Sequence, residues 1–284
     1  MSALPVPAIA LTRGTNGEEV LIPQLGAGTY KVADDEAERV VREALDVGYR
    51  HIDTAQMYGN EAGVGRAIAA CGLPRQDLFI TSKLNNPNHR RDDALRSFEA
   101  TMEALGLEVL DLFLVHWPLA DSAGIDLVDT WRTMIEILHS GRVCAIGVSN
   151  FQPEHLHRIA QATGVVPAVN QIELHPWLIQ SELRRVHAQL GIATESWSPL
   201  GRGRLLDDPV VVEIAESLGV SPAQVIIRWH LQSGLVVIPK SIHRQRMASN
   251  AEIFAFTLDD AQMAALDALD RNVRTGSHPD QIQV

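Results

Sequence analysis

Apolar and polar positions follow one recurring unit along the chain. An amphipathic segment ends in glycine, and a short apolar run that itself ends in polar residues follows a few positions later. Helices commonly end at a glycine with a positive φ. The apolar runs are β-branched and do not alternate with polar residues, which is typical of parallel strands buried on both faces. The units are VGYRHIDTA, LGLEVLDLFLVH, SGRVCAIGVSN, TGVVPAVNQIE, LGIATESWS and SGLVVIPKS.

Helical patterns lie between these runs. Apolar residues recur at spacings of three and four in DDEAERVVREAL from Asp34, DDALRSFEATMEAL from Asp92 and LVDTWRTMIEIL from Leu127. DLFITSK after Gly72 and QLGAGTYK near residue 24 bring the predicted strands to eight. Eight strands that alternate with helices in 284 residues predict an α/β fold, the (β/α)8 TIM barrel. We expect one barrel domain over residues 1–284.

A doubly wound sheet is the alternative fold. It usually carries a glycine-rich phosphate turn after its first strand. Here GAGTYK lacks the third glycine of GxGxxG, and no other GxGxxG exists in the chain. That absence favours the barrel.

Two segments lie outside the repeat. IALTRGTNGEEVLIP carries Asn16-Gly17 between apolar runs, which predicts an N-terminal β-hairpin that plugs the barrel floor. LGRGRLLDDP, from Leu200, predicts an inserted loop after the seventh strand, and the tail TGSHPDQIQV has no pattern.

Composition and charge exclude several classes of protein. Hydrophobic residues make up 46% of the chain, which argues against disorder, and no run approaches the length of a membrane span. No signal peptide is recognisable, and Cys71 and Cys144 are expected to be reduced, buried thiols, so we expect a cytoplasmic protein. The net charge of −11 and the lack of basic runs argue against a nucleic-acid partner. No long apolar surface stretch demands a partner chain, so we expect a monomer.

Polar side chains end nearly every predicted strand. The carboxyl ends of all barrel strands surround one mouth, where active sites are built. Loops are polar for other reasons too, so any one of these residues can be structural, but the set as a whole is harder to explain without function. The set is Thr29, Tyr30, Asp53, Tyr58, Lys83, His116, Ser149, Asn150, Gln171, Trp197, Ser198, Lys240 and Ser241.

Asp53, Tyr58, Lys83 and His116 form a chemically coherent group. A tyrosine is too weak an acid to assist at neutral pH unless its pKa falls, and a nearby lysine ammonium group lowers it. An aspartate beside the lysine keeps the amine charged and in place. A neutral histidine can hydrogen-bond to a substrate carbonyl group. The four residues therefore predict general acid catalysis at a C=O group.

Other chemistries have no motif here. GVSNF is not the GxSxG nucleophile elbow, and neither HExxH nor CxxC occurs, so we expect no metal site. His155 and His157 would face different sides of a helix and are expected at the surface. A Schiff-base lyase would need Lys83 unpaired and nearly neutral, which a neighbouring Asp53 opposes.

Two further groups have open alternatives. Trp197 either packs in the core or stacks on a flat ligand ring. Lys240, Ser241 and Arg246 either bind a phosphate group or form a helix start, with Ser241 as the cap and the basic side chains in solvent.

The chain resembles the aldo-keto reductase family over nearly its whole length. The motifs that carry the resemblance are GYRHIDTAQMYGNE, ITSKL, DLFLVHWP, GVSNF, NQIELHP, SWSPLGRG and IPKSIHRQRMASN. VVPAVNQIELHPW, ESWSPLG and RWHLQ are most similar to the bacterial 2,5-diketo-D-gluconate reductase type.

The resemblance implies hydride transfer from NADPH to a small-molecule carbonyl substrate. Tyr58 would donate the proton, Lys83 would lower its pKa, Asp53 would pair with Lys83, and His116 would orient the carbonyl group. Trp197 would stack on the nicotinamide; Ser149, Asn150 and Gln171 would hold its carboxamide. Lys240, Ser241 and Arg246 would hold the 2′-phosphate, and Asn250 would reach the adenine. The other expected cofactor contacts are Gly28, Thr29, Tyr30, Asp53, Ser198, Leu200 and Arg202. The expected substrate contacts are Tyr30, Tyr58, Asn85, His116 and Trp117.

Departures from the family pattern bear on the substrate. Tyr30 and Asn85 stand where tryptophan is frequent, which predicts a more polar pocket for a small dicarbonyl or sugar-derived carbonyl compound. Trp117 and Trp177 are candidate walls. Ser249 replaces a frequent glutamate beside Asn250. The competing hypothesis is an NADPH-binding protein of the same fold with weak or no catalysis.

Overall fold

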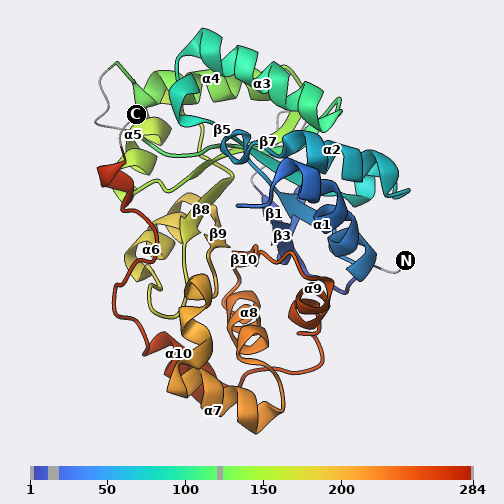
Figure 1. Cartoon of the computed structure of the whole chain (residues 1–284). Coiled ribbons are helices and arrows are strands. Elements are labelled where there is room, and N and C mark those ends of the chain that lie inside the picture. Colours follow the sequence, from blue (N-terminus) through green and yellow to red (C-terminus); the bar gives the residue numbers. More distant parts are fainter. Residues whose placement is uncertain (1–2, 12–18, 120–123, 283–284) are drawn as a thin grey trace.

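The computed structural model describes residues 3–11, 19–119 and 124–282. Eight parallel strands form one sheet in the sequential order β3 to β10. A parallel bridge between Leu25 and Val237 brings its two edges together. The predicted (β/α)8 barrel is therefore confirmed, with the strands enclosed by helices (Figure 1). The strands are β3 (Gly26–Gly28), β4 (His51–Asp53), β5 (Phe79–Leu84), β6 (Leu110–Val115), β7 (Val143–Ser149), β8 (Val169–Glu173), β9 (Ala193–Trp197) and β10 (Val236–Val237).

The helices lie where the apolar spacing predicts them. In α1 the apolar residues face the core, and the helix ends at Gly48, whose φ of 117° only glycine adopts without strain. In α8, Ser221 and Gln224 form a capping box that satisfies the free N–H groups of the first turn. The helices are α1 (Asp34–Val47), α2 (Glu61–Ala70), α3 (Arg91–Leu105), α4 (Leu127–His139), α5 (Pro153–Thr163), α6 (Ser181–Leu190), α7 (Pro209–Leu218), α8 (Pro222–Gln232), α9 (Arg244–Ala251) and α10 (Asp260–Asp267).

Short 3₁₀ helices shape the connections. They are η1 (Gln56–Tyr58), η2 (Arg75–Asp77), η3 (Asn86–Asn88), η4 (Gly201–Asp207) and η5 (Pro279–Gln281). The loop predicted from Leu200 is η4 together with the start of α7. The sequence predicted one helix between successive strands, but two helices, α7 and α8, lie between β9 and β10.

The N-terminal hairpin closes the barrel floor as expected. Strands β1 (Ala8–Leu11) and β2 (Val20–Pro23) pair antiparallel. Leu11 and Ile22 are buried in one cluster with side chains from the barrel strands, including Phe79 and Leu112. The Asn16-Gly17 turn lies outside the described residues.

The cysteines and the membrane-span prediction can also be compared with the structure. Neither Cys71 nor Cys144 forms a disulfide, but each is half-buried rather than fully buried as expected. Within residues 3–11, 19–119 and 124–282, no single helix is long and apolar enough to cross a membrane. The α7–α8 pair meets the length and composition test only jointly, across a 92° bend.

Candidate active site

The first four strands of the barrel bring the reactive side chains to one end. Gly28 pairs with Asp53, and Asp53 pairs with Thr81, in the parallel registers of β3, β4 and β5. Lys83 lies two residues beyond Thr81 and therefore points to the same face of the sheet as Thr81. The strand pairing alone thus places an amine above a carboxylate near the barrel mouth.

Asp53 and Lys83 form a buried ion pair. Nζ of Lys83 donates hydrogen bonds to both carboxylate oxygens of Asp53, at 2.7 and 2.8 Å, and to the carbonyl oxygen of Thr54 at 2.9 Å. Lys83 is 0% exposed and Asp53 2%. Burial alone would lower the pKa of Lys83, but the combined effects of Asp53, Tyr58 and Glu195 outweigh burial, and the pKa is raised. The amine therefore stays charged.

Tyr58 meets this pair from the turn η1. Its hydroxyl oxygen lies 3.4 Å from Nζ of Lys83, whose charge also lies 5.0 Å from the ring centre. Gly59 follows with φ of 65° and ends the turn. Burial raises the pKa of Tyr58 to about 12, and Lys83 opposes that rise without cancelling it. Lys83 therefore lowers the pKa as expected, but the loss of hydration outweighs this effect, and the net pKa of Tyr58 lies above its ordinary value.

His116 completes the group. It follows β6, is 7% exposed, and its ring meets the ring of Tyr58 edge-on at 5.7 Å. Burial, assisted by the charge of Lys83, lowers its pKa well below the ordinary value, so the ring is neutral. Its Nδ1 has no hydrogen-bond partner among the described residues. A buried, unpaired ring nitrogen is costly unless a ligand uses the site.

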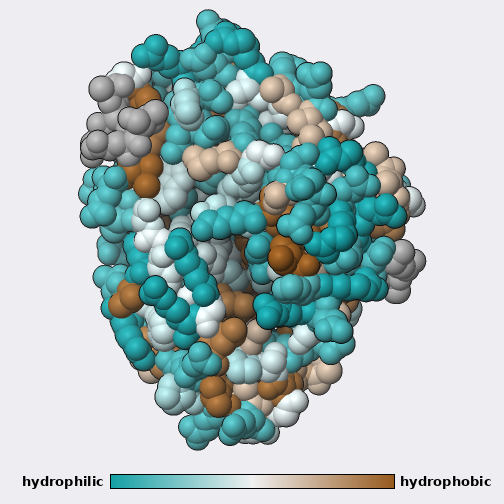
Figure 2. Space-filling model, in the orientation of Figure 1, coloured by the Kyte–Doolittle hydropathy of each residue, from teal (hydrophilic) through white to brown (hydrophobic). Residues whose placement is uncertain are grey.

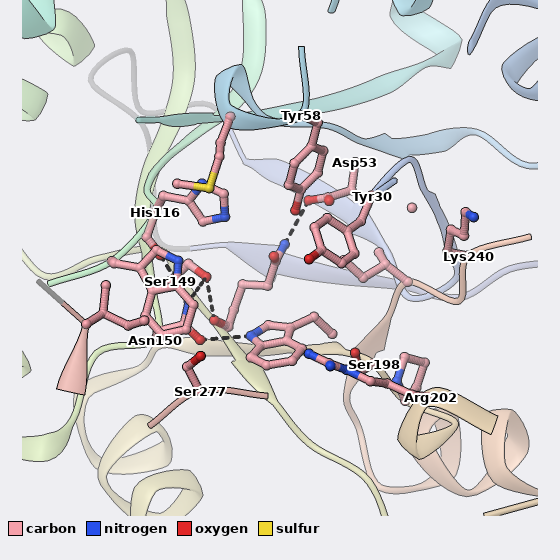
Figure 3. A pocket seen from close by; sticks show the side chains of 18 of the residues that line it. Tyr30, Asp53, Tyr58, His116, Ser149, Asn150, Ser198, Arg202, Lys240 and Ser277 are labelled. Atoms are coloured by element: carbon pink, nitrogen blue, oxygen red, sulfur yellow. Dashed lines mark hydrogen bonds between the residues drawn. The ribbon is translucent and has the colours of Figure 1, made fainter. Parts of the chain in front are cut away.

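A cavity of about 330 Å³ lies above these residues. A recess is visible near the middle of the face in Figure 2. In Figure 3, Tyr58 and Asp53 lie on one side of the cavity, and Asn150, Ser198 and Arg202 lie across from them. The predicted residues that line it are Gly28, Tyr30, Asp53, Tyr58, His116, Trp117, Ser149, Asn150, Gln171, Trp197, Ser198, Arg202 and Lys240.

The polar groups along the cavity floor are tied to one another. The indole nitrogen of Trp197 donates to Oδ1 of Asn150 at 2.8 Å, and Nδ2 of Asn150 donates to the carbonyl oxygen of His116 at 3.0 Å. The hydroxyl of Ser149 donates to the carbonyl oxygen of Gln171 at 2.8 Å. Asn150 holds a left-handed backbone conformation, with φ of 65°. These bonds fix the indole ring at the cavity wall, where a flat ligand ring could stack.

A second cavity, of about 840 Å³, adjoins the first and shares Tyr30, Ser198, Pro199, Arg202 and Lys240 with it. Its lining also contains Leu200, Ser241, Arg246 and Asn250, as predicted. Basic side chains therefore gather around the two adjoining cavities, although the whole chain carries a net charge of −11. Ser241 is not the cap of α9, since His243 holds that position and the Ser241 hydroxyl bonds to the His243 backbone.

Three expected residues lie elsewhere. The hydroxyl of Thr29 is buried and donates to the carbonyl oxygen of Asp53, so it does not line the main cavity. Asn85 does not line it either, because its side chain caps η3 by accepting from the backbone N–H of Asn86, and Asn86 lines the cavity instead. Trp177 is no wall of that cavity, since its indole nitrogen donates to Asp208 at 2.9 Å and Arg271 lies over its ring.

Comparison with known proteins agrees with this geometry. A model of the aldo/keto reductase family matches residues 23–271. The chain belongs to this family.

Relatives from this family match nearly the whole chain. A protein of Mycolicibacterium smegmatis, called an aldo-keto reductase, is 49% identical over 273 residues, which cover 96% of this chain and 97% of that one. The crystal structure of Gox0644 in its apo form matches with a TM-score of 0.90 and 45% identity, over 98% and 99% of the two chains. An aldo-keto reductase of Bombyx mori, solved in complex with NADP, matches with a TM-score of 0.87 and 34% identity, over 98% and 96%.

Sequence reasoning missed several residues of this aldo/keto reductase site. Met57, Asn86, Ser277 and Ile282 line the main cavity, and the last two belong to the tail without a pattern. The tail is held by Glu173, whose carboxylate accepts hydrogen bonds from the backbone of Thr275 and Gly276. The signal in the sequence was Glu173, a carboxylate at the end of the predicted strand NQIE. Its partners could not be predicted because they lie about a hundred residues away.

Gln56, which had no assigned role, anchors the turn that carries Tyr58. Its oxygen accepts from the backbone N–H of Asn85 at 2.8 Å and from the hydroxyl of Ser97 at 2.9 Å. Its nitrogen donates to the carbonyl oxygen of Ser97 at 2.9 Å and the hydroxyl of Thr101 at 2.8 Å. One side chain thus joins η1 to the end of β5 and to α3.

Proposed function

We propose that this protein is an NADPH-dependent carbonyl reductase in which Tyr58 is the general acid. The observation that carries the proposal is the position of its hydroxyl oxygen, 3.4 Å from the charged Nζ of Lys83 and at the wall of the main cavity. Asp53 holds Lys83 in place through both of its carboxylate oxygens. The family membership supports the same reaction class.

The residues of the two cavities fit the cofactor. When bound, NADPH supplies the hydride for carbonyl reduction. Trp197 offers a fixed flat ring for the nicotinamide, and Ser149, Asn150 and Gln171 lie beside it. Lys240, Ser241 and Arg246 line the second cavity and offer charge and hydrogen-bond donors to a 2′-phosphate group. Related proteins solved with NADP or NADPH support this choice.

The proton comes from the Tyr58 hydroxyl. Burial raises its pKa to about 12, so the phenol carries its proton at neutral pH and depends on the charge of Lys83 to release it. The phenolate that forms lies beside Lys83, whose ammonium group stabilises the new negative charge. Neutral His116, next to Tyr58, can orient the carbonyl oxygen by a hydrogen bond. Such acid catalysis contributes roughly 10²- to 10⁴-fold in rate.

The substrate class proposed is a small dicarbonyl or sugar-derived carbonyl compound, as for the 2,5-diketo-D-gluconate reductase type. The substrate end of the cavity combines Tyr30, Trp117 and Met57 with the polar side chains of Asn86 and Ser277. A volume of about 330 Å³ suits a small molecule. The amide comes from Asn86 rather than Asn85, and the prediction of a partly polar pocket therefore still stands.

The test is Tyr58→Phe, assayed at the NADPH absorbance band against methylglyoxal, a sugar-derived ketone and an aromatic aldehyde. Turnover should fall about 10³-fold while NADPH binding stays near normal. Tyr49→Phe is the matched control for turnover, since its hydroxyl donates to the Met247 carbonyl oxygen on α9 and Tyr49 does not line the main cavity. Near-normal turnover by Tyr58→Phe would refute its role. NADPH binding by the wild-type protein without turnover of any compound would favour the non-catalytic binding protein.

A further inference from the structure

A second carboxyl group, Glu195, lies inside the barrel beside the catalytic ion pair. It is on β9, is 0% exposed, and has no role in the proposed reaction. Its Oε2 accepts a hydrogen bond from Nε2 of Gln171 at 2.9 Å, and the same Nε2 donates to Oδ2 of Asp53 at 2.8 Å. Gln171 therefore bridges the two buried carboxyl groups.

This bridge fixes the orientation of the Gln171 amide. The carboxylate of Asp53 can only accept hydrogen bonds, and an amide oxygen in the bridging position would face it without a proton between them. The NH₂ group must therefore point inward, where both of its protons are used. The amide oxygen is then the atom left to face the cavity that Gln171 lines.

The surroundings of Glu195 also locate a proton. Nδ1 of His51 lies 3.3 Å from the carbonyl oxygen of Pro23, which can only accept, so Nδ1 carries a hydrogen. Nε2 lies 3.2 Å from the hydroxyl of Thr81, which can donate to it, and 3.6 Å from Oε1 of Glu195. A neutral His51 therefore offers only a lone pair to Oε1, which has no hydrogen-bond partner among the described residues. An ionised Glu195 carboxylate would receive no hydrogen bond from His51. A protonated Glu195 can instead direct its O–H toward the lone pair on Nε2 of His51.

We propose that Glu195 is a positioning residue: a protonated carboxyl group that holds the Gln171 amide with its oxygen toward the cavity and leaves Asp53 as the carboxylate that pairs with Lys83. With NADPH bound, the NH₂ group of the nicotinamide carboxamide would donate to the Gln171 oxygen, and this part of the inference rests on the proposed function. The protonation of Glu195 and the Gln171 bridge do not depend on that function.

The charges around Glu195 agree with a bound proton. Burial, and then the negative charge of Asp53, raise the pKa of Glu195 to about 8, while Gln171 and Lys83 act in the opposite direction. Burial lowers the pKa of His51 to about 4, so the shared proton belongs to Glu195 and not to the imidazole ring. Asp53 and His51 on β4, Lys83 on β5 and Gln171 on β8 are the titratable or polar groups that face it.

Infrared difference spectroscopy tests the proton directly. The spectrum of the wild-type protein minus that of Glu195→Gln should show the C=O band of one protonated carboxyl group at neutral pH. The band should disappear as the pH rises through about 8. Absence of the band at pH 7, as for an ion pair with a His51 imidazolium, would overturn the proposal. This measurement needs neither substrate nor cofactor, so it remains decisive even if the proposed reductase activity fails.

Titration of NADPH binding tests the bridge. Glu195→Gln keeps an acceptor for Gln171 and a donor for His51, so its NADPH dissociation constant should stay within about twofold of the wild-type value at pH 7, without the wild-type change near pH 8. Glu195→Leu leaves a Gln171 N–H unpaired and should weaken NADPH binding about tenfold. A large loss of binding in Glu195→Gln, with an unchanged thermal midpoint, would show that a carboxylate is required. Wild-type affinity in a folded Glu195→Leu would show that the bridge does not position the amide.

Discussion

Gly276 packs directly against the indole ring of Trp197. A methyl group built on Gly276 would overlap Cη2 of the ring and would approach a carboxylate oxygen of Glu173 at 3.3 Å. The backbone N–H of Gly276 is already bonded to that carboxylate. The C-terminal segment therefore covers one part of the ring that is proposed to stack on the cofactor, and only glycine fits at this contact.

Gly276→Ala should displace this segment from Trp197. We expect the KM for the carbonyl substrate to rise several-fold, because Ser277 and Ile282 line the cavity and would move with the segment. Proteolysis between residues 274 and 282 should also become faster. Thr275→Ser is the control, since it keeps the hydroxyl that bonds to Glu173. Unchanged kinetics and proteolysis in Gly276→Ala would contradict the tight packing.

Gln56→Leu should impair catalysis without impairing cofactor binding. The substitution removes the bonds that hold η1 and leaves the backbone N–H of Asn85 without the Gln56 oxygen as its partner. We expect about 2 kcal/mol less free energy of unfolding and a kcat about tenfold lower, because the Tyr58 hydroxyl loses its fixed position.

The control for that variant is Gln76→Leu, an exposed glutamine in the 3₁₀ turn η2, outside both cavities of the site. It should leave kcat unchanged. The NADPH dissociation constant should stay constant in both variants. A fall in stability without any fall in kcat would mean that Gln56 supports only the fold.

The sequence predicted the barrel and the Asp53–Lys83 pair because both depend on local pattern. Buried parallel strands are recognisable as continuous apolar runs, and the polar residues at their carboxyl ends must meet at one mouth. The same reasoning could not place Gln56 or Glu173, whose partners are far away in sequence. Asn85 was predicted one position away from the true lining residue, because the turn η3 begins directly after it.

The pKa of Tyr58 shows a different limit. Chemistry predicts the direction of the Lys83 effect, but the net value depends on how much water the fold removes from the phenol. No residue pattern contains that quantity. Glu195 was missed for a related reason, since it sits within a strand and its importance comes only from the neighbours that β4 and β8 supply.

Buried histidines should make the protein sensitive to acid. Burial lowers the pKa of His51, His89, His187 and His230 to about 4, from an ordinary value of 6.5. The unfolded chain binds protons as the pH falls below about 6.5, whereas the folded chain resists until about 4, so stability is complete above 6.5 and is lost below it. Each of these rings contributes up to roughly 3 kcal/mol to the free energy of unfolding that is lost on acidification.

The measurement is the urea midpoint at about pH 7.5 and about pH 5. His187→Gln should reduce the fall in the urea midpoint between these two pH values. His157→Gln, which changes an exposed ring, should leave that fall unchanged. Equal losses in the wild-type protein and in His187→Gln would mean that other groups dominate the acid response.

Arg246 should distinguish NADPH from NADH. It projects from the first turns of α9 into the second cavity, together with Lys240 and Ser241, and its exposed side chain forms no ion pair among the residues described. A guanidinium group there is available for the extra phosphate of NADPH, which NADH lacks. Arg246→Ala should therefore weaken NADPH binding about tenfold or more and leave NADH binding nearly unchanged.

Arg244→Ala is the matched control, because Arg244 is exposed on the same helix but does not line the cavity. Fluorescence titration of both cofactors against the three proteins gives the comparison, and equal losses for the two cofactors in Arg246→Ala would assign the phosphate to another residue.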